Sequence, residues 1–540
     1  MVIKIIFLVV FFAAMLLVGF LSRKGAKDIN GFVLGGRSVG PWLSAFSFGT
    51  SYFSAVIFIG YAGRFGWNFG LASTWIGLGN ALIGSLMAWV ILGRRTRIMT
   101  QHLGSKTMPD FFDLRFHSKA LKIVAALIVF VFLIPYTASL FNGLSQLFAA
   151  SFAGIPYWGW VIIMAVLTAI YVIVGGYMGS AINNFIQGII MLVGIVAVVA
   201  AVITQNGGLS EAIAKLSEGS TTTAAGTTFQ GAYTSFFGPQ PLQLLGVVVL
   251  TSLGTWGLPQ MISKFYAIKD ESAVKKGTII STLFALIVAG GCYFLGGFGR
   301  LYANDIAMKA DGVTPESFDQ IIPAMLNKVD VEWGVLGTVL IGLVLVLVLA
   351  ASMSTLSSLV MTSSSTVTLD LIVPLSKKTI SEKKQMIIMR VLIALAIVSA
   401  AAIAILLVVN PSLAGKLYIS DLMGISWGAL AGCFLAPFLY GLFWKKVTVP
   451  AVWASFVTGL GIMLTEFVLT SVLDVRFANP FMSYFFNNAI NAGMLAMMVG
   501  LAVVPVVSLL TLKMATADVD DMFKCYNKEV TVSVKTSLEE

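Results

Sequence analysis

The chain carries a series of apolar stretches, each about as long as a membrane-spanning helix and separated by short polar segments. A helix that crosses the bilayer core needs roughly 20 apolar residues. Of the 540 residues, 58% are hydrophobic and only 11% are charged, whereas a globular domain is about a quarter charged. The pattern predicts an all-α integral membrane protein with about 13 transmembrane helices. The predicted spans cover residues 2–22, 41–63, 70–92, 121–149, 157–177, 183–204, 239–262, 277–300, 334–369, 386–409, 417–442, 450–472 and 488–512.

The basic residues between these spans predict the orientation of the chain, because cytoplasmic loops carry an excess of Lys and Arg. With the N-terminus outside and the C-terminus in the cytoplasm, most of the 34 Lys and Arg residues lie on the cytoplasmic side. Lys264 then begins a cytoplasmic segment, 264–276, and Arg64 is interpreted as a charged anchor at the outer membrane surface. We expect a multi-pass protein of the plasma or inner cell membrane.

Few residues of the chain suit catalysis or a transition-metal site. The sequence has two histidines and three widely separated cysteines, without a Cys-x-x-Cys or His-Glu-x-x-His motif. Its basic residues are scattered over many loops, which disfavours a nucleic-acid surface. We therefore expect no enzyme activity and no nucleic-acid partner. The expected partners are a small solute, an ion and the lipid bilayer, around a protein that acts as a monomer.

Two of the predicted spans contain residues that interrupt a helix. The first interruption is 47–55, where small and hydroxyl residues cluster, and the second is 254–260, with two glycines and Pro259. Each alone is equally compatible with a helix contact built from small residues. Since they fall in the first helix of each of two five-span halves, together they predict an inverted-repeat transporter with its site at the broken helices. The predicted division is 1–40 (first helix and cytoplasmic loop), 41–206 (first repeat, spans 2–6), 207–238 (extracellular loop), 239–442 (second repeat, spans 7–11), 443–512 (spans 12 and 13) and 513–540 (cytoplasmic tail).

The ninth span carries a dense run of hydroxyl side chains between Ser352 and Thr366. Their spacing puts many of them on one helical face. Hydroxyl and carbonyl oxygens are ligands for hard cations such as sodium. The alternative is that each hydroxyl bonds to the carbonyl four residues earlier in its own helix. We interpret the density of hydroxyls as an ion-lined face.

Five stretches of the sequence resemble the sodium/solute symporter family, in the order in which that family has them. They are 31–37, 108–116, 182–187, 353–357 and 424–444. The resemblance extends from about residue 3 to residue 512 and includes the bacterial proline carriers of the family. It implies a LeuT-type fold with an inverted five-plus-five helix repeat, and it implies sodium as the coupling ion.

The resemblance also implies a sodium site between the broken second span and the ninth span. Its ligands would be the backbone carbonyls of Thr50, Phe53 and Ala351 and the side-chain hydroxyls of Ser354 and Thr355. Four of these residues fall within the interruption and the hydroxyl run that were identified from the sequence pattern, and Ala351 directly precedes the run.

A second sodium site is expected to be vestigial. Relatives with a second ion place an aspartate where this chain has Asn184, while Ser357 and Ser358 remain as hydroxyl partners. Because the carboxylate is missing, we expect one sodium ion per transport cycle.

The solute is predicted from substitutions at positions that sugar and proline carriers use. Ile57 and Thr74 stand where sugar carriers have Gln and Glu, so a sugar would lack hydrogen-bonding partners. Tyr136 matches a substrate-side tyrosine of the proline carriers, whereas Thr251 and Thr255 replace their aromatic residues. The candidate substrate-binding residues are Ser54, Ala55, Tyr136, Thr251, Thr255, Trp256 and Gln260.

The predicted function is therefore sodium-coupled symport of a small polar organic solute, such as an amino acid like proline or an organic anion. Two alternatives remain open. One is proton-coupled symport on the same fold, which requires a titratable group at the site. The other is a sodium symporter of the sugar or sialic-acid type.

Overall fold

The computed structural model describes residues 2–22, 28–152, 154–222, 228–410, 419–514 and 518–527. Within these residues the regular structure is almost entirely helical. Ten helices are long and apolar enough to cross a membrane, or up to eleven if a bent helix pair forms one span. The expectation of a helical, multi-pass membrane protein is thereby confirmed.

The first part of the chain extends to the long helix α9. Its helices are α1 (Val2–Ser22), α2 (Ile29–Leu34), η2 (Gly35–Arg37), α3 (Pro41–Tyr52), η3 (Val56–Tyr61), α4 (Ala62–Phe69), η4 (Gly70–Ser73), α5 (Thr74–Gly79), η5 (Asn80–Met87), η6 (Trp89–Gly93), α6 (Arg94–Leu103), α7 (Met108–Phe116), α8 (Lys119–Ser151) and α9 (Tyr157–Gln205).

A short connecting region follows, in which β1 (Ser220–Thr222) pairs antiparallel with β2 (Thr228–Gln230). The remaining elements are α10 (Leu209–Ser217), η7 (Ala232–Thr234), α11 (Pro241–Leu253), η8 (Gly254–Gly257), α12 (Pro259–Tyr266), α13 (Glu271–Gly296), η9 (Gly299–Asp305), η10 (Phe318–Gln320), α14 (Ile321–Trp333), α15 (Val335–Thr366), η11 (Val367–Ile372), α16 (Val373–Leu375), α17 (Glu382–Val409), α18 (Ile419–Phe443), α19 (Val449–Glu466), η12 (Phe467–Val472), α20 (Pro480–Phe486), α21 (Ala489–Leu510), η13 (Leu512–Met514), α22 (Val519–Phe523) and η14 (Lys524–Asn527).

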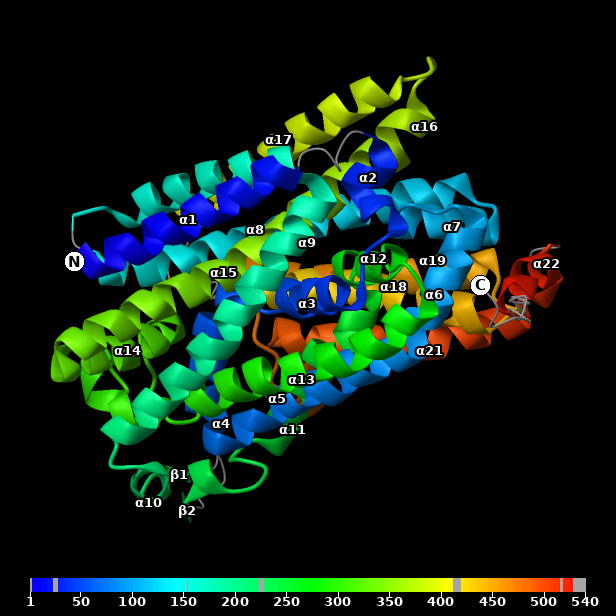
Figure 1. Ribbon diagram of the computed structural model, residues 1–540. Helices are drawn as coiled ribbons and strands as arrows, with labels where there is room; N and C mark the ends of the chain where they lie inside the picture. Colours follow the sequence, from blue (N-terminus) through cyan, green and yellow to red (C-terminus); the bar gives the residue numbers. More distant parts are fainter. Residues whose placement is uncertain are drawn as a thin grey trace, which may run out of the picture.

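The long helices run along one axis, and their connections separate into two groups at opposite ends of the bundle. The start of α1 lies at the end that holds α10, β1, β2 and α14, whereas α6, α7, α16 and α22 lie at the other end (Figure 1). The segments expected outside the cell therefore lie together, and so do those expected in the cytoplasm.

The centre of the bundle is formed by the helices that expose least of their apolar surface. In the most apolar stretch of α18, 94% of the residues are buried, whereas in that of α1 only 22% are buried. The short helix α3 contacts α9, α12, α13 and α15, and it lies near the middle of the bundle in Figure 1. The residues at the two interruptions, 53–55 and 254–260, are themselves buried in protein.

Local sequence signals explain where several helices begin. The side chains of Thr107, Ser118 and Asp270 accept hydrogen bonds from backbone amides at the starts of α7, α8 and α13. Pro241 and Pro259 occupy the first turns of α11 and α12. Backbone N–H groups there make no hydrogen bond within the helix, so a proline costs nothing at these positions.

Both predicted helix interruptions are confirmed, and their backbones adopt the same conformation. After α3, Phe53 is extended, with φ −90° and ψ 129°. After η8, Leu258 is extended, with φ −85° and ψ 118°, and the chain bends by 45° before α12. An extended residue inside a span leaves carbonyl oxygens without helical partners. These two points are the places where main-chain oxygens are available to a ligand.

Two further breaks divide the longest helical stretches. Gly70 has φ 61° and ψ −140°, and Gly176 has φ 56° and ψ −158°, both outside the helical region. Residues 56–103 and α9 contain 48 and 49 residues, which is more than twice what the roughly 30 Å bilayer core accommodates.

The helices α4 and α13 cross at backbone contact. A Cβ atom at Gly66 would lie 2.0 Å from the backbone C and O of Gly296, and one at Gly296 would lie 2.0 Å from the carbonyl oxygen of Ala62. Glycine allows helices in membranes to approach this closely. The contact fixes the second half of the broken second span against α13.

Candidate functional site

Five oxygen atoms from α3 and α15 meet at the first helix break. Ser354 Oγ lies 2.9 Å from the carbonyl oxygen of Thr50 and 2.8 Å from that of Ala351. Thr355 Oγ1 lies 3.2 Å from Thr50 O, 3.0 Å from Phe53 O and 3.1 Å from Ala351 O. All five residues are at most 2% exposed. The structure thus brings together every residue of the sodium site that the resemblance implied.

The chemistry of this oxygen cluster suits a hard monovalent cation. Two hydroxyl hydrogens cannot occupy the lone pairs of three carbonyl oxygens, so the cluster has more acceptors than donors. Its oxygen atoms are uncharged, and none of them belongs to a carboxylate. Across the described residues, no group of three or more His, Cys, Asp or Glu side chains could hold a metal ion. The cluster therefore differs from a transition-metal centre in its ligand type.

A neighbouring contact holds the break against α15. The backbone amide of Ala55, just after the extended residue, donates to Ser352 Oγ at 2.9 Å. Ser54 Oγ accepts from the amide of Val56 at 3.2 Å, which caps the second half of the broken span. The hydroxyl run of α15 therefore supplies partners on both sides of the interruption.

The residues of the expected second ion site contact different partners. Asn184 Nδ2 lies 3.4 Å from Ser47 Oγ, and Ser357 Oγ donates to the carbonyl of Ser354 at 2.8 Å. Ser358 contacts α3 at a different residue, since its Oγ lies 2.7 Å from Ser51 Oγ. The three predicted residues are buried but share no hydrogen bond with one another.

Lys264 lies beside this second group, contrary to its predicted place in a cytoplasmic loop. Its side chain belongs to α12, the residue is only 5% exposed, and Nζ donates to Ser358 Oγ at 2.9 Å. Hydropathy placed the end of the span at residue 262, whereas the helix after the break continues to Tyr266. The basic residue was therefore assigned to the loop although the fold buries it.

The predicted substrate-binding residues divide into two groups. Thr255 Oγ1 donates to the carbonyl of Gly84 at 3.1 Å, and Trp256 Nε1 donates to that of Ile83 at 3.0 Å, so both hold η8 against η5. Thr251 Oγ1 bonds within its own helix, to Val247 O at 2.8 Å. These three side chains have protein partners.

In the second group, Ser54 and Ala55 lie at the first break and Tyr136 belongs to a cluster of aromatic rings beside it. The ring of Trp427 lies 5.8 Å from that of Tyr52 and 5.9 Å from that of Tyr136. In the described part of the chain, the Tyr52 and Tyr136 hydroxyls and Trp427 Nε1 are buried without a hydrogen-bond partner, and so are both amide atoms of Gln260. Buried polar atoms without a partner thus lie at the first break and, with Gln260, just after the second, where a polar ligand could bind them.

Tyr52 and Trp427 were not among the predicted site residues. Tyr52 lies inside the first interruption, which was the available signal for it. Trp427 belongs to α18, within a stretch that carried the family resemblance, but nothing in the local pattern separates this tryptophan from an ordinary core residue.

At one end of the site, Arg64 forms a partly buried ion pair and not the predicted surface anchor. Its guanidinium contacts Asp421 Oδ1 at 2.5 Å and Ser420 Oγ at 2.6 Å. Nearby, Asp319 Oδ2 accepts from the amide of Ile419 at 3.4 Å. Burial raises the pKa of the Asp319 carboxyl to about 7, and the charge of Asp421 adds to the shift.

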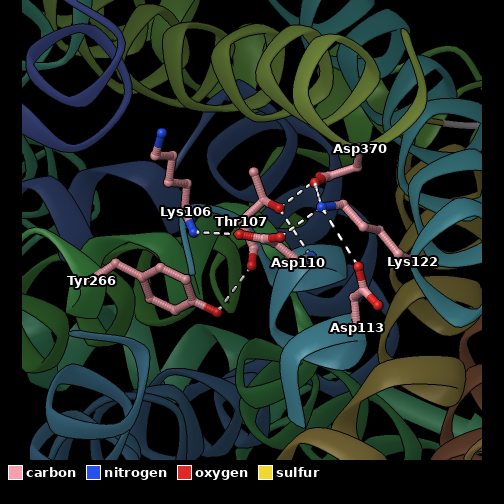
Figure 2. A network of polar contacts seen from close by, with 7 residues as sticks. All are labelled: Lys106, Thr107, Asp110, Asp113, Lys122, Tyr266 and Asp370. Carbon is pink, nitrogen blue, oxygen red and sulfur yellow. Dashed lines mark hydrogen bonds and ion pairs between the residues drawn. The ribbon is translucent and has the colours of Figure 1, made fainter. Parts of the chain in front are cut away.

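At the opposite end, a charged network joins α7, α8 and η11. Lys122 Nζ contacts Asp110 at 2.6 Å, Asp370 at 3.5 Å and Asp113 at 4.0 Å (Figure 2). Thr107 Oγ1 donates to Asp370 at 2.6 Å. Figure 2 shows these side chains converging from separate helices, with Tyr266 alongside. The network ties η11, which continues the hydroxyl-rich helix α15, to α7 and α8.

The sequence is similar to known proteins over most of its length. The model of the sodium:solute symporter family matches residues 32–459. The osmoregulated proline transporter of Bacillus subtilis is 30% identical over 463 residues, covering 85% of this chain and 88% of the relative. The sodium/proline symporter of Escherichia coli is 26% identical and covers 83% and 85%.

Solved structures agree on the fold. A sodium-coupled sialic acid symporter superposes with a TM-score of 0.72 at 20% identity, over 95% of this chain and 98% of that one. MhsT bound to L-phenylalanine superposes with a TM-score of 0.54 at 16% identity, over 88% and 99%. These similarities confirm the LeuT-type fold. With its oxygen cluster at a broken span, its helical architecture and this family match, the chain belongs to the sodium:solute symporter family.

Proposed function

We propose that this protein couples the inward movement of one sodium ion to the uptake of a small polar organic solute by alternating access. The observation that carries the proposal is the convergence of Thr50, Phe53, Ala351, Ser354 and Thr355 at the first helix break. The ion would bind their five oxygens. It is a transported substrate here, so its affinity must permit release as well as capture.

Sodium would couple to the solute through the position of the broken span. The ion joins the end of α3 to α15, while the aromatic cluster with Tyr52 and Tyr136 lies on the same break. Holding the break in one geometry also orders the solute site. The effect is a difference in affinity between states, so the solute must tighten sodium binding by the same factor.

The chemistry of the aromatic cluster supports an amino acid such as proline, or a small organic anion, as the solute. Tyr52, Tyr136 and Trp427 offer apolar ring faces, and their polar atoms, with the amide of Gln260, lack protein partners. The relatives named as proline transporters support the same class. Ser54 and Ala55 would line the site from the break, and Thr251, Thr255 and Trp256 would position η8 behind it.

The finer architecture also belongs to the proposal. If the breaks at Gly70 and Gly176 each divide two spans, the ten helices and the bent pair become the thirteen expected spans. The matching conformations of Phe53 and Leu258 support an inverted repeat of 41–206 and 239–442. The first helix and loop (1–40), the outer loop (207–238), spans 12 and 13 (443–512) and the cytoplasmic tail (513–540) would flank the repeats.

The segregated ends of the bundle support an outside N-terminus and a cytoplasmic C-terminus in the cell membrane. The monomer is proposed as the functional unit. No enzyme activity and no nucleic-acid partner are proposed, since the relatives are transporters.

Purified protein in liposomes tests the proposal against its proton-coupled and sugar-type alternatives. An imposed inward sodium gradient should drive uphill uptake of one amino acid or carboxylate, chosen from a panel that includes proline, sugars and sialic acid. A proton gradient in sodium-free buffer should drive none. Uptake that follows the proton gradient alone would refute sodium coupling, and uptake of only a sugar or sialic acid would refute the proposed solute class.

A further inference from the structure

Lys264 is a buried basic side chain without a carboxylate partner in the described part of the chain. It is 5% exposed, and its Nζ contacts Ser358 Oγ at 2.9 Å and lies 5.2 Å from the centre of the Tyr177 ring. Among the described residues, no acidic side chain lies within 4.0 Å of this nitrogen. Buried lysines inside membrane proteins are costly and are normally paired or functional. The ring face of Tyr177 and one hydroxyl are weak compensation.

The ammonium lies next to oxygens of the kind that bind sodium. Ser358 Oγ lies 2.7 Å from Ser51 Oγ and 3.1 Å from the carbonyl of Ser354, whose own hydroxyl belongs to the five-oxygen cluster. Ser358 follows Ser354 by one helical turn, which is about 5.4 Å along the axis. Lys264 therefore carries its charge one turn from the proposed ion, on the side of α12.

These contacts continue to a polar atom without a partner. Ser51 Oγ donates to the carbonyl of Ser47 at 2.5 Å, and Ser47 Oγ lies 3.4 Å from Asn184 Nδ2. Asn184 is 1% exposed and its Oδ1 has no hydrogen-bond partner. Polar atoms of α3, α9 and α15 are thus linked through a chain of contacts to Ser358, the hydroxyl that the Lys264 ammonium contacts.

We propose that the ammonium of Lys264 serves as a tethered second cation, in the position that a second sodium ion would otherwise take. It joins α12 to α15 and, through Ser358, to α3, as a bound ion would. Because it is covalently attached, it is not transported. This proposal rests on the proposed sodium coupling and gives a physical cause for a stoichiometry of one sodium per cycle.

The experiment counts sodium ions bound to purified protein with ²²Na⁺, in wild type and in two double variants. Lys264→Met with Asn184→Asp removes the tethered charge and supplies a carboxylate for a free ion. Lys264→Arg with Asn184→Asp supplies the same carboxylate but keeps a positive charge, and is the matched control. The flux ratio of ²²Na⁺ to solute in liposomes is measured on the same proteins.

We expect one bound sodium in wild type, two in the Met double variant and one in the Arg double variant. Two bound ions in wild type would overturn the proposal, and so would a single ion in a Met double variant that still binds at the five-oxygen cluster. If wild type binds no sodium at all, the proposed function fails first, so the two failures are distinguishable.

A second measurement covers the case in which the Met double variant does not fold. Lys264→Cys is alkylated either with an aminoethyl group, which restores an ammonium at nearly the original length, or with a neutral group of similar size. We expect the aminoethyl form to recover sodium-driven uptake and the neutral form to remain inactive. Equal recovery by the neutral group would show that size and not charge matters, and would overturn the proposal.

Discussion

The side chain of Thr355 provides the sharpest test of the proposed ion site. Its Oγ1 lies 3.2, 3.0 and 3.1 Å from the carbonyl oxygens of Thr50, Phe53 and Ala351, so it contacts more of the cluster than any other single atom in it. The change Thr355→Val keeps the branched shape and removes only this oxygen. The remaining three carbonyls and the hydroxyl of Ser354 would still face the ion.

The expected effect follows from the loss of one ligand to a charged group. A polar contact with a charge contributes about 1.5–3 kcal/mol, which corresponds to roughly 10- to 150-fold in affinity. The sodium concentration for half-maximal uptake should therefore rise by this factor in liposomes, while the maximal rate at saturating sodium changes less. Removing both hydroxyls, with Ser354→Ala and Thr355→Ala together, should abolish sodium-stimulated uptake of a folded protein.

Thr368→Val is the matched control on the continuation of the same helix. Thr368 is buried, and its Oγ1 donates to the carbonyl of Ser364 at 2.8 Å, away from the cluster. Loss of the Thr368 hydroxyl should leave the sodium dependence of uptake unchanged. An unaltered sodium dependence in Thr355→Val, or an equal shift in both variants, would refute the assignment of this hydroxyl as a ligand.

Three further predictions concern packing, pH and the charged network. Gly296→Ala should lower the melting temperature of the purified protein through overpacking, which costs about 1–3 kcal/mol. A Cβ at Gly290 on the same helix meets no atom within 4 Å, so Gly290→Ala should leave the melting temperature unchanged. Equal effects of the two substitutions would contradict the backbone contact. Native Asp319 holds its proton up to about pH 7 and the unfolded chain loses it near pH 4, so stability should fall as pH rises through that window. Asp319→Asn should remove that part of the fall in a thermal unfolding series, and an unchanged slope would argue against a buried, protonated carboxyl. Asp370→Asn should leave Lys122 less well neutralised and weaken the link between η11 and α7 by up to about 3 kcal/mol. A cysteine introduced by Ser365→Cys should then be labelled faster than in the protein with Asp370. An unchanged labelling rate would contradict the role of this link.

The meeting of the proposed ion ligands was predictable in part because two local signals identify the two segments that supply them. An interruption rich in small residues predicted free carbonyls, and a dense run of hydroxyls predicted side-chain oxygens. The structure joins Thr50 to Ser354 and Phe53 to Thr355, pairs about 300 positions apart in sequence. Only the fold, or the family resemblance, could indicate that the two segments touch.

The solute site was less predictable because its contacts are not local. Trp427 meets Tyr52 and Tyr136 from α18, and no periodicity distinguishes it from the apolar residues around it. Thr255 and Trp256 were chosen from their place at the second break, yet both side chains bond to the carbonyls of η5. Side-chain direction at a broken helix depends on its backbone angles, which composition does not specify.

The charged residues show the limit of hydropathy most clearly. Lys264 and Arg64 were placed at the ends of spans, where such residues usually face lipid headgroups or water. In the fold Lys264 follows a helix break into the interior, and Arg64 pairs with Asp421 from α18. A hydropathy window cannot separate a charge at the surface from one that meets a partner on a distant helix.

The most direct test of the central claim is a high-resolution density map of the solute-bound protein in sodium and in potassium. We expect a single spherical density among the oxygens of Thr50, Phe53, Ala351, Ser354 and Thr355 in sodium, and its loss or weakening in potassium together with the solute. A well-ordered solute in sodium buffer with no ion density among these oxygens would contradict the coupling of transport to this site.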